Sequence, residues 1–350
     1  MYPQDLLERP FGAESRRFLI RQYLDSVGVV TPEDAWKHVY RLLMWIDPTT
    51  SLAHCYESDK SQPGRHWYDR SMAFHAWLSA ALGSSPRTLH REIDILFKGV
   101  ISILAVVEAE EKDKRRKNAL RQRADFDADM PDATGDPDLI ENISAMLAQH
   151  YGTAPSEALV SEIIDTVTQD LYRENKRKNL LGEGFEDTLA SVIRECAGAS
   201  SLEVHNRALL HDLPGFREPP KHEKARAVDL AVVSKTTGHR SLATVKWSVR
   251  ADREEQFTID LDTYSRMEFD GQPFSFVFLT NEFDAARLVA ACRRRHGHRL
   301  MFDAVVHMNP EALVAVHSLK TRAKANDLLE HINEGRLISL GQWIRNLEAS

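Results

Sequence analysis

Apolar and polar positions repeat with a helical period through the first third of the chain. In 34–46 and 71–82, large apolar side chains recur every three or four residues, which predicts amphipathic helices. A third helix is expected over about 89–109, where it runs into a dense series of charges. Residues 1–124 are therefore expected to form an all-helical domain.

The pattern changes beyond residue 139, where short apolar runs appear. The runs 227–233 and 241–246 are typical of β-strands, and the polar loop between them contains Gly238, so together they predict a hairpin. Further strands are expected at 274–280 and 300–307, and helices at 139–149, 156–174, 184–197, 253–269, 283–295, 310–316 and 323–348. This order of elements predicts an α/β (α+β) domain with one central mixed sheet.

Residues 125–138 separate the two patterns. This stretch is acidic and contains proline and glycine, which is typical of a linker. We therefore expect three parts in the chain: an N-terminal helical accessory domain over 1–124, the acidic linker, and a larger α/β domain over 139–350.

The composition fits a globular protein and does not by itself favour a nucleic-acid partner. Hydrophobic residues make up 43% of the 350, enough for a sizeable core, whereas the net charge of −7 requires any phosphate-binding surface to be local. The three cysteines form no CxxC pair, which argues against a cysteine zinc site. With no signal-peptide pattern and no apolar run of bilayer length, we expect a soluble cytoplasmic protein without membrane contact.

One charged residue stands in each strand of the expected hairpin. Asp229 interrupts an apolar run, where an unpaired charge is costly, and Lys246 ends the next run two residues after Thr244. The strand period of two places Thr244 and Lys246 on the same face. Metal-assisted hydrolysis of phosphodiesters combines hard oxygen ligands for Mg²⁺ with a cation near the reacting phosphate. An ordinary hairpin with an edge aspartate and an exposed lysine would show the same pattern.

Three further charged residues follow Lys246 closely: Arg250, Asp252 and Arg253. An arginine can donate two hydrogen bonds to guanine O6 and N7, and an aspartate can accept one from the cytosine amino group. An R-x-D-R motif that begins four residues after a strand lysine resembles the CCGG-family type II restriction endonucleases of the PD-(D/E)XK fold. In that family an Asp comes from one strand and the Lys from the next, as Asp229 and Lys246 do here.

The resemblance also bears on the second metal ligand. The family commonly has Ser, Thr or Cys at the position of Thr244, and its acidic ligand lies on the following helix about fourteen residues past the lysine. Counting from Lys246 leads to Asp260, where the family more often has Glu. Glu255 and Asp262 are the alternatives for this role.

A further family feature is a Glu on a helix that precedes the Asp strand. The expected helix 184–197 carries Glu186 at the border of its apolar stripe, where the side chain could face a cleft. Glu183 and Asp187 are rivals for this position, and an ordinary solvated carboxylate is the alternative interpretation.

Taken together, the resemblance implies a Mg²⁺-dependent, site-specific deoxyribonuclease whose catalytic and DNA-recognition domain spans 139–350. Asp229 and Asp260 would hold Mg²⁺, Glu186 would assist through water, Lys246 would orient the attacking water, and Thr244 would support these groups from behind. Base contacts in the major groove would come from Arg250, Asp252 and Arg253. The family implies a homodimer that cuts double-stranded DNA at a palindrome with a CCGG core and leaves 5′ overhangs. A bacterial cytoplasmic enzyme of this kind works beside a cognate DNA methyltransferase.

Two alternatives stay open. The same chemistry could act on a core with an unpaired middle base, CCNGG, and a chain with this fold could bind DNA specifically without cutting it. Two basic segments, 176–179 and 293–299, could contact phosphate, and the second has the pattern of a basic helix end with a glycine cap.

Overall fold

The structure is a computed structural model. It describes residues 12–46, 50, 66–97, 182–196, 199–249, 254–317 and 323–349, and single positions at 113, 141, 144–145, 148–149, 156 and 159. The chain divides into two compact units, the first made of Met1–Pro10 and Gly99–Leu180 and the second of Phe11–Lys98 and Leu181–Ser350. Almost all of the described residues belong to the second unit.

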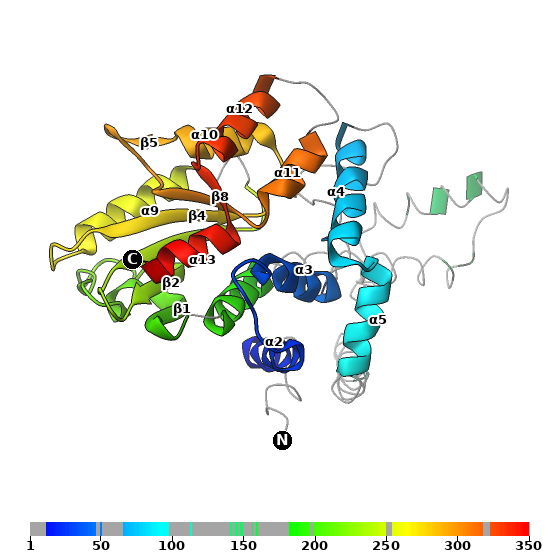
Figure 1. Cartoon of the computed structure of the whole chain (residues 1–350), viewed down its shortest axis with the longest axis horizontal. Helices are drawn as coiled ribbons and strands as arrows, with labels where there is room; N and C mark the ends of the chain where they lie inside the picture. Colours follow the sequence, from blue (N-terminus) through cyan, green and yellow to red (C-terminus); the bar gives the residue numbers. More distant parts are fainter. Residues whose placement is uncertain are drawn as a thin grey trace, which may run out of the picture. The chain divides into compact units, whose positions relative to one another are not determined.

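A six-stranded mixed sheet forms the centre of the second unit (Figure 1). Its spatial order is β1-β2-β3-β4-β7-β8; the first three strands pair antiparallel, and the others are parallel. The strands are β1 (Leu202–Leu209), β2 (Ala227–Ser234), β3 (Arg240–Lys246), β4 (Phe274–Thr280), β7 (Ala304–His307) and β8 (Leu337–Ser339). The expected α/β class with one central mixed sheet is confirmed.

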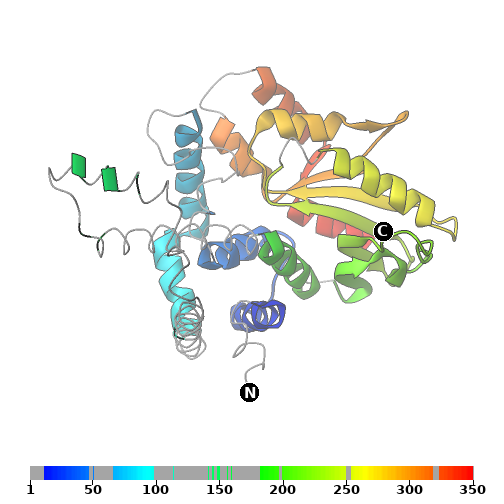
Figure 2. The same cartoon turned by 180° about the vertical axis from the view of Figure 1, so that it is seen from behind.

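Helices cover both faces of this sheet (Figures 1 and 2). On one face lie α9 (Glu254–Met267) and α10 (Ala285–Arg293), and the Phe257 ring of α9 lies 5.3 Å from the Phe278 ring of β4. On the other face α13 (Leu340–Ala349) contacts β2, β7 and β8. Among the helices that the structure describes, none is both long enough and apolar enough to cross a membrane.

The N-terminal helices pack within the same unit as the sheet. They are α2 (Ala13–Val27), α3 (Ala35–Ile46), α4 (His66–Leu82) and α5 (Pro86–Leu96). α4 packs on α11 (Pro310–His317) and α3 on α13, and the ring of Tyr40 lies 6.4 Å from that of Trp247. This grouping differs from the separate helical domain expected over 1–124, because the apolar faces of α3 and α4 are buried against C-terminal elements. The expected boundaries at 124 and 138 lie outside the described residues.

Local periodicity predicted several elements correctly. The hairpin of β2 and β3 is confirmed, and its turn contains Gly238 at φ +74° with its N–H bonded to the Ser234 carbonyl. β4 has the expected bounds, and α9 and α10 lie within the expected helices. The helix predicted at 184–197 is present at 182–195. The helices expected at 139–149 and 156–174 lie almost wholly outside the described residues.

Three expectations about the C-terminal third are wrong. The single helix expected over 323–348 is divided into α12 (Ala323–Asn333), β8 and α13, because Gly335 adopts φ +68° and the residues after it pair with β7. The basic segment 293–299 is not a capped helix end. α10 stops at Arg293, and the hairpin of β5 (Arg295–His296) and β6 (Arg299–Leu300) follows, with Gly297 in its turn. The strand expected at 300–307 is correspondingly shortened to β7.

A buried arginine fixes the start of β3. Arg240 is 1% exposed and donates hydrogen bonds to the Pro214 carbonyl and the Asp270 carboxylate, both at 2.9 Å. Its guanidinium also lies over the Phe216 ring, 4.9 Å from the centroid. The loops before β2 and β4 are thereby tied to the strand that ends in Lys246. Gly215 leaves room for this arginine, since a Cβ at that position would overlap the Arg240 guanidinium and the Asp270 carboxylate.

We predict that Gly215→Ala destabilises the protein well beyond the cost of its backbone conformation. Gly271 is the matched control, because it also has positive φ, +73° against +80°, but a Cβ there meets nothing within 4 Å. Gly271→Ala should cost about 1 kcal/mol for the left-handed backbone. Gly215→Ala should cost about 1–3 kcal/mol more for the forced displacement of Arg240. Urea unfolding of both variants measures the difference, and equal losses of stability would contradict the proposed packing.

Candidate active site

The β2–β3 hairpin brings Asp229 and Lys246 into direct contact. The Lys246 Nζ lies 2.6 Å from Asp229 Oδ2. The Val245 N–H donates to the same oxygen at 2.8 Å, and the Thr244 hydroxyl lies 3.5 Å from it. The side chains of Asp229 and Lys246 are about one-quarter exposed, 26% and 25%, whereas Thr244 is buried. The charged pair is thus partly open to solvent, and the backbone of β3 fixes the Asp229 carboxylate through the Val245 N–H.

Glu186 shares the electrostatic environment of this pair. It lies on helix 182–195, and its side chain is 14% exposed. The pKa of Glu186 is raised to about 7: burial is the largest cause, the negative charge of Asp229 acts in the same direction, and Lys246 and Arg207 act in the opposite direction. The carboxyl can therefore change its charge near neutral pH.

The two rivals of Glu186 have structural partners instead. Asp187 is completely buried and accepts hydrogen bonds from Arg16 Nε at 2.9 Å and Asn206 Nδ2 at 2.6 Å. Glu183 is 57% exposed and pairs with Arg16 Nη2 at 2.7 Å.

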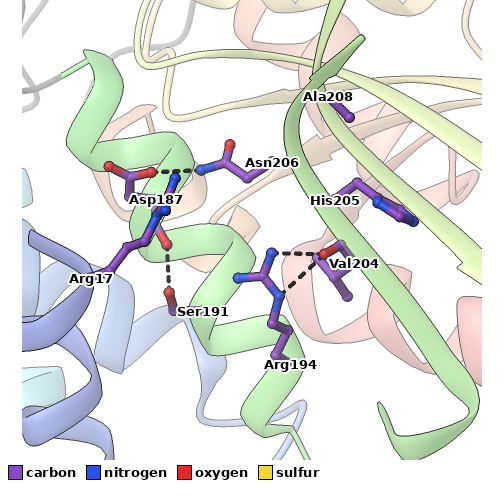
Figure 3. Close-up of a pocket in the computed structure, with 8 residues that line it drawn as sticks. All are labelled: Arg17, Asp187, Ser191, Arg194, Val204, His205, Asn206 and Ala208. Atoms are coloured by element: carbon purple, nitrogen blue, oxygen red, sulfur yellow. Dashed lines mark hydrogen bonds between the residues drawn. The ribbon is translucent and has the colours of Figure 1, made fainter. Parts of the chain in front are cut away.

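Asp187 also lines a polar pocket of about 430 Å³ between α2, helix 182–195 and β1 (Figure 3). In Figure 3 its carboxylate turns toward the Asn206 amide. None of Glu186, Asp229 and Lys246 lines this pocket. Asp187 therefore holds α2 and β1 to the helix. The adjacent Glu186 instead interacts electrostatically with Asp229 and Lys246 of the hairpin.

Arg207 binds both carboxylates of this helix, Glu186 and Asp187. Its guanidinium donates to Glu186 Oε2 at 3.1 Å and also binds the Asp187 carboxylate. The residue has φ +51°, and the β1–β2 pairs on either side are Asn206 with Leu230 and Ala208 with Val228. Left-handed backbone is costly for an arginine and marks a constrained position. Sequence reasoning missed this residue, because neither β1 nor a left-handed arginine has a local signal.

Asp260 is the third carboxylate near the hairpin, on α9. Burial raises its pKa, and the charge of Asp229 acts in the same direction, while a hydrogen bond from Gln256 and the charges of Arg226 and Lys246 lower it. Gln256 Nε2 donates to Asp260 Oδ1 at 2.7 Å. This pair has the i, i+4 spacing of neighbours on a helix, so the contact could have been predicted from the sequence.

The alternatives to Asp260 lie elsewhere. Asp262 binds the ring of His296 at 2.8 Å, and Glu255 is exposed. We refer to Glu186, Asp229 and Asp260 as the carboxylate cluster, since Asp229 raises the pKa of the other two.

The proposed recognition residues Arg250, Asp252 and Arg253 lie outside the described residues. The positions that flank them, Val249 and Glu254, are described.

The donor chemistry of the carboxylate cluster fits a hard divalent cation. All its groups are oxygen donors, which Mg²⁺ prefers, and a cation would relieve the repulsion that opposes ionisation of Glu186. Among the described residues, however, no three His, Cys, Asp or Glu side chains are close enough together to hold a metal ion.

The raised pKa of Glu186 predicts a pH-dependent stability of the metal-free protein. The folded chain holds this proton more tightly than the unfolded chain, so its stabilising contribution is present below pH ~4 and lost as the pH rises to 7. At pH 8 Glu186→Gln should therefore be more stable than the wild type, by about 1–3 kcal/mol. The advantage should vanish at pH ~4.

Denaturant unfolding in EDTA at both pH values measures this effect. Glu195→Gln, an exposed position on the same helix, is the control and should change little at either pH. A gain for Glu186→Gln of the same size at both pH values would contradict the assignment.

Comparison of the chain with models of known protein families gives no match, and comparison with curated proteins gives no similar chain.

Proposed function

We propose that the protein is a Mg²⁺-dependent type II restriction endonuclease that hydrolyses double-stranded DNA at a short palindrome with a CCGG core. The observation that carries the proposal is the contact of Lys246 with Asp229 at the open end of the β2–β3 hairpin. The charges of both residues act on the pKa of two further carboxyls, Glu186 and Asp260. A lysine beside carboxylate oxygens suits metal-assisted phosphodiester hydrolysis, in which oxygen ligands hold the cation and a positive group stabilises the charge that develops on the phosphate.

The residues of the site have separable tasks. Lys246 lies at the open side of the pair, where its ammonium can orient the attacking water and stabilise negative charge on the phosphate. Glu186, with a pKa of about 7, can exchange a proton with water at neutral pH. Asp229 and Asp260 would hold Mg²⁺, with Glu186 assisting through water. When bound, the ion supplies charge neutralisation and lowers the pKa of a coordinated water.

The pairing of β2 with β3 in a mixed sheet supports this proposal. The PD-(D/E)XK fold is a mixed sheet in which adjacent strands present the Asp and the Lys, and β2 and β3 are such a pair. Arg250 follows Lys246 by four residues, which limits their Cα separation to about 14 Å. Side chains that read bases from this segment would thus work beside the cleaved phosphate.

Partners and setting belong to the same proposal. A palindromic site matches a two-fold symmetric dimer, so we expect a homodimer on DNA. Arg250, Asp252 and Arg253 would read the CC and GG halves from the major groove, since paired Arg–guanine and Asp–cytosine contacts discriminate the bases. In a bacterial cytoplasm such an enzyme needs a cognate methyltransferase to protect host DNA.

We predict that Lys246→Ala abolishes DNA cleavage and preserves specific DNA binding. The variant loses the cation beside Asp229 but keeps the segment 250–253. Plasmid cleavage in Mg²⁺ and in EDTA, with binding to a duplex oligonucleotide in Ca²⁺, separates the two activities. Lys235→Ala is the control, because Lys235 lies in the turn of the same hairpin and its ammonium donates to the Ser200 carbonyl at 3.0 Å. Normal cutting by Lys246→Ala would refute the site, and specific binding by a wild type that never cuts would favour the non-cleaving alternative.

We predict that Arg250→Ala weakens specific DNA binding by about 1–3 kcal/mol, the usual effect of a lost bidentate contact to guanine. Its binding to unrelated DNA should change far less. Arg345→Ala is the control, since Arg345 pairs with Glu33 and belongs to α13, which lies on the face of the sheet opposite α9. Sequencing the ends of plasmid cut by the wild type distinguishes CCGG from CCNGG and reveals the overhang. Unchanged discrimination by Arg250→Ala would refute the assignment of the recognition residues.

A further inference from the structure

A buried carboxylate and an arginine hold the residue that precedes the proposed recognition segment. The Val249 N–H donates to Glu282 Oε2 at 2.9 Å, and the Val249 carbonyl accepts a hydrogen bond from the Arg287 guanidinium. Arg287 and Glu282 also pair with one another at 3.5 Å. Both backbone groups of Val249 are thus bound by one ion pair, directly before Arg250.

Glu282 is 1% exposed, so its charge needs a specific reason to be there. Its other oxygen, Oε1, accepts from the N–H groups of Phe283 at 2.9 Å and Asp284 at 2.8 Å. Helix α10 does not depend on Glu282 for its cap, because Asp284 Oδ1 accepts from the N–H groups of Ala286 and Arg287. Glu282 Oε2 is therefore not needed for the helix, and it binds Val249, which lies outside the helix.

The loop that carries Glu282 is itself fixed on several sides. The Asn281 N–H donates to the Trp247 carbonyl at 3.2 Å, and the Tyr40 hydroxyl binds the Asn281 side chain. The Phe283 carbonyl interacts with His317 Nε2 at 2.9 Å. Residues 281–284 are thus a rigid support that binds Trp247 and Val249, the first and third residues after Lys246.

We infer that Glu282 and Arg287 are positioning residues that set the sequence specificity of cleavage. We call this ion pair the Val249 clamp. The inference rests on the proposed function, because it takes 250–253 as the segment that reads bases. With the clamp intact, Val249 is held in one position directly before Arg250, so a mismatch leaves polar groups unpaired and the site misaligned. Release of Val249 removes this fixed point and relaxes the discrimination.

The test compares Arg287→Lys with Arg336→Lys. Lysine keeps the charge but cannot bind the Val249 carbonyl and Glu282 as the planar guanidinium does. Arg336 is the matched control, because it is also partly buried and binds backbone carbonyls, Cys292 at 2.9 Å and Asp303 at 3.1 Å, far from β3's end. The substrates are duplex oligonucleotides with the site mapped by end sequencing, and the same duplexes with one core base pair changed.

We expect Arg287→Lys to lower the ratio of kcat/KM for the intact site to that for the changed site by about 10- to 100-fold, the scale of a small misplacement at a catalytic site. Arg336→Lys should leave the ratio within about twofold, well below the tenfold that 1.4 kcal/mol represents. Amide hydrogen exchange at Val249 should be faster in Arg287→Lys and unchanged in Arg336→Lys.

The outcomes separate the inference from the function beneath it. Equal ratios and equal Val249 exchange in the two variants, with a wild type that cuts specifically, would overturn the clamp and leave the endonuclease proposal intact. A wild type that neither cuts nor binds DNA would overturn both. If Arg287→Lys does not fold, Glu282→Gln replaces it, since an amide with one acceptor oxygen cannot accept from Val249 and from the α10 loop at once. An unaltered ratio in Glu282→Gln would overturn the clamp equally.

Discussion

The contact between Lys246 Nζ and Asp229 Oδ2 depends on the register of a single hairpin. In that register the two residues lie on neighbouring strands with their side chains on the same face, and a slip by one residue would turn one of them to the opposite face. Arg240 secures the register at the far end of β3, where it ties the loops before β2 and β4 to the strand. A buried arginine outside the site therefore helps determine the geometry of the exposed pair.

Sequence periodicity was sufficient for the features that local chain geometry governs. Asp229 and Lys246 could be selected because a charge inside an apolar strand is costly and because a strand has period two. Asp260 was selected only because the family that the sequence resembles has an acidic residue at that distance from its lysine. The contacts of Arg207 with Glu186 and of Glu282 with Val249 could not be foreseen, because they join residues 21 and 33 positions apart. The N-terminal helices were expected to form their own domain for the same reason, since an amphipathic helix does not specify which apolar surface covers it.

Two adjacent carboxyl groups of helix 182–195 have different environments: Asp187 holds the structure together, and Glu186 belongs to the proposed site. Asp187 is buried among Arg16, Arg207 and Asn206, which satisfy its charge and hold three elements together. Glu186, one residue earlier, has only Arg207 as a direct partner among the hydrogen bonds described and feels the charge of Asp229. The consequence is a carboxyl whose protonation state can respond to a bound cation, beside one whose oxygens are held by side chains of α2 and β1.

Trp247 connects the N-terminal helices to the proposed site, because its ring packs on α3 and it directly follows Lys246 in the chain. Its ring is 4% exposed and packs edge-on against Tyr40 of α3 and Phe185 of helix 182–195, with the Phe185 ring 5.1 Å away. The residues on either side of it in the chain are Lys246 and the stretch that leads to Val249. Loss of α3 would therefore remove one side of the packing around the residue that follows the lysine. The described N-terminal helices and the hairpin belong to one compact unit, so a change in α3 can reach the chain beside Lys246 without touching the site itself.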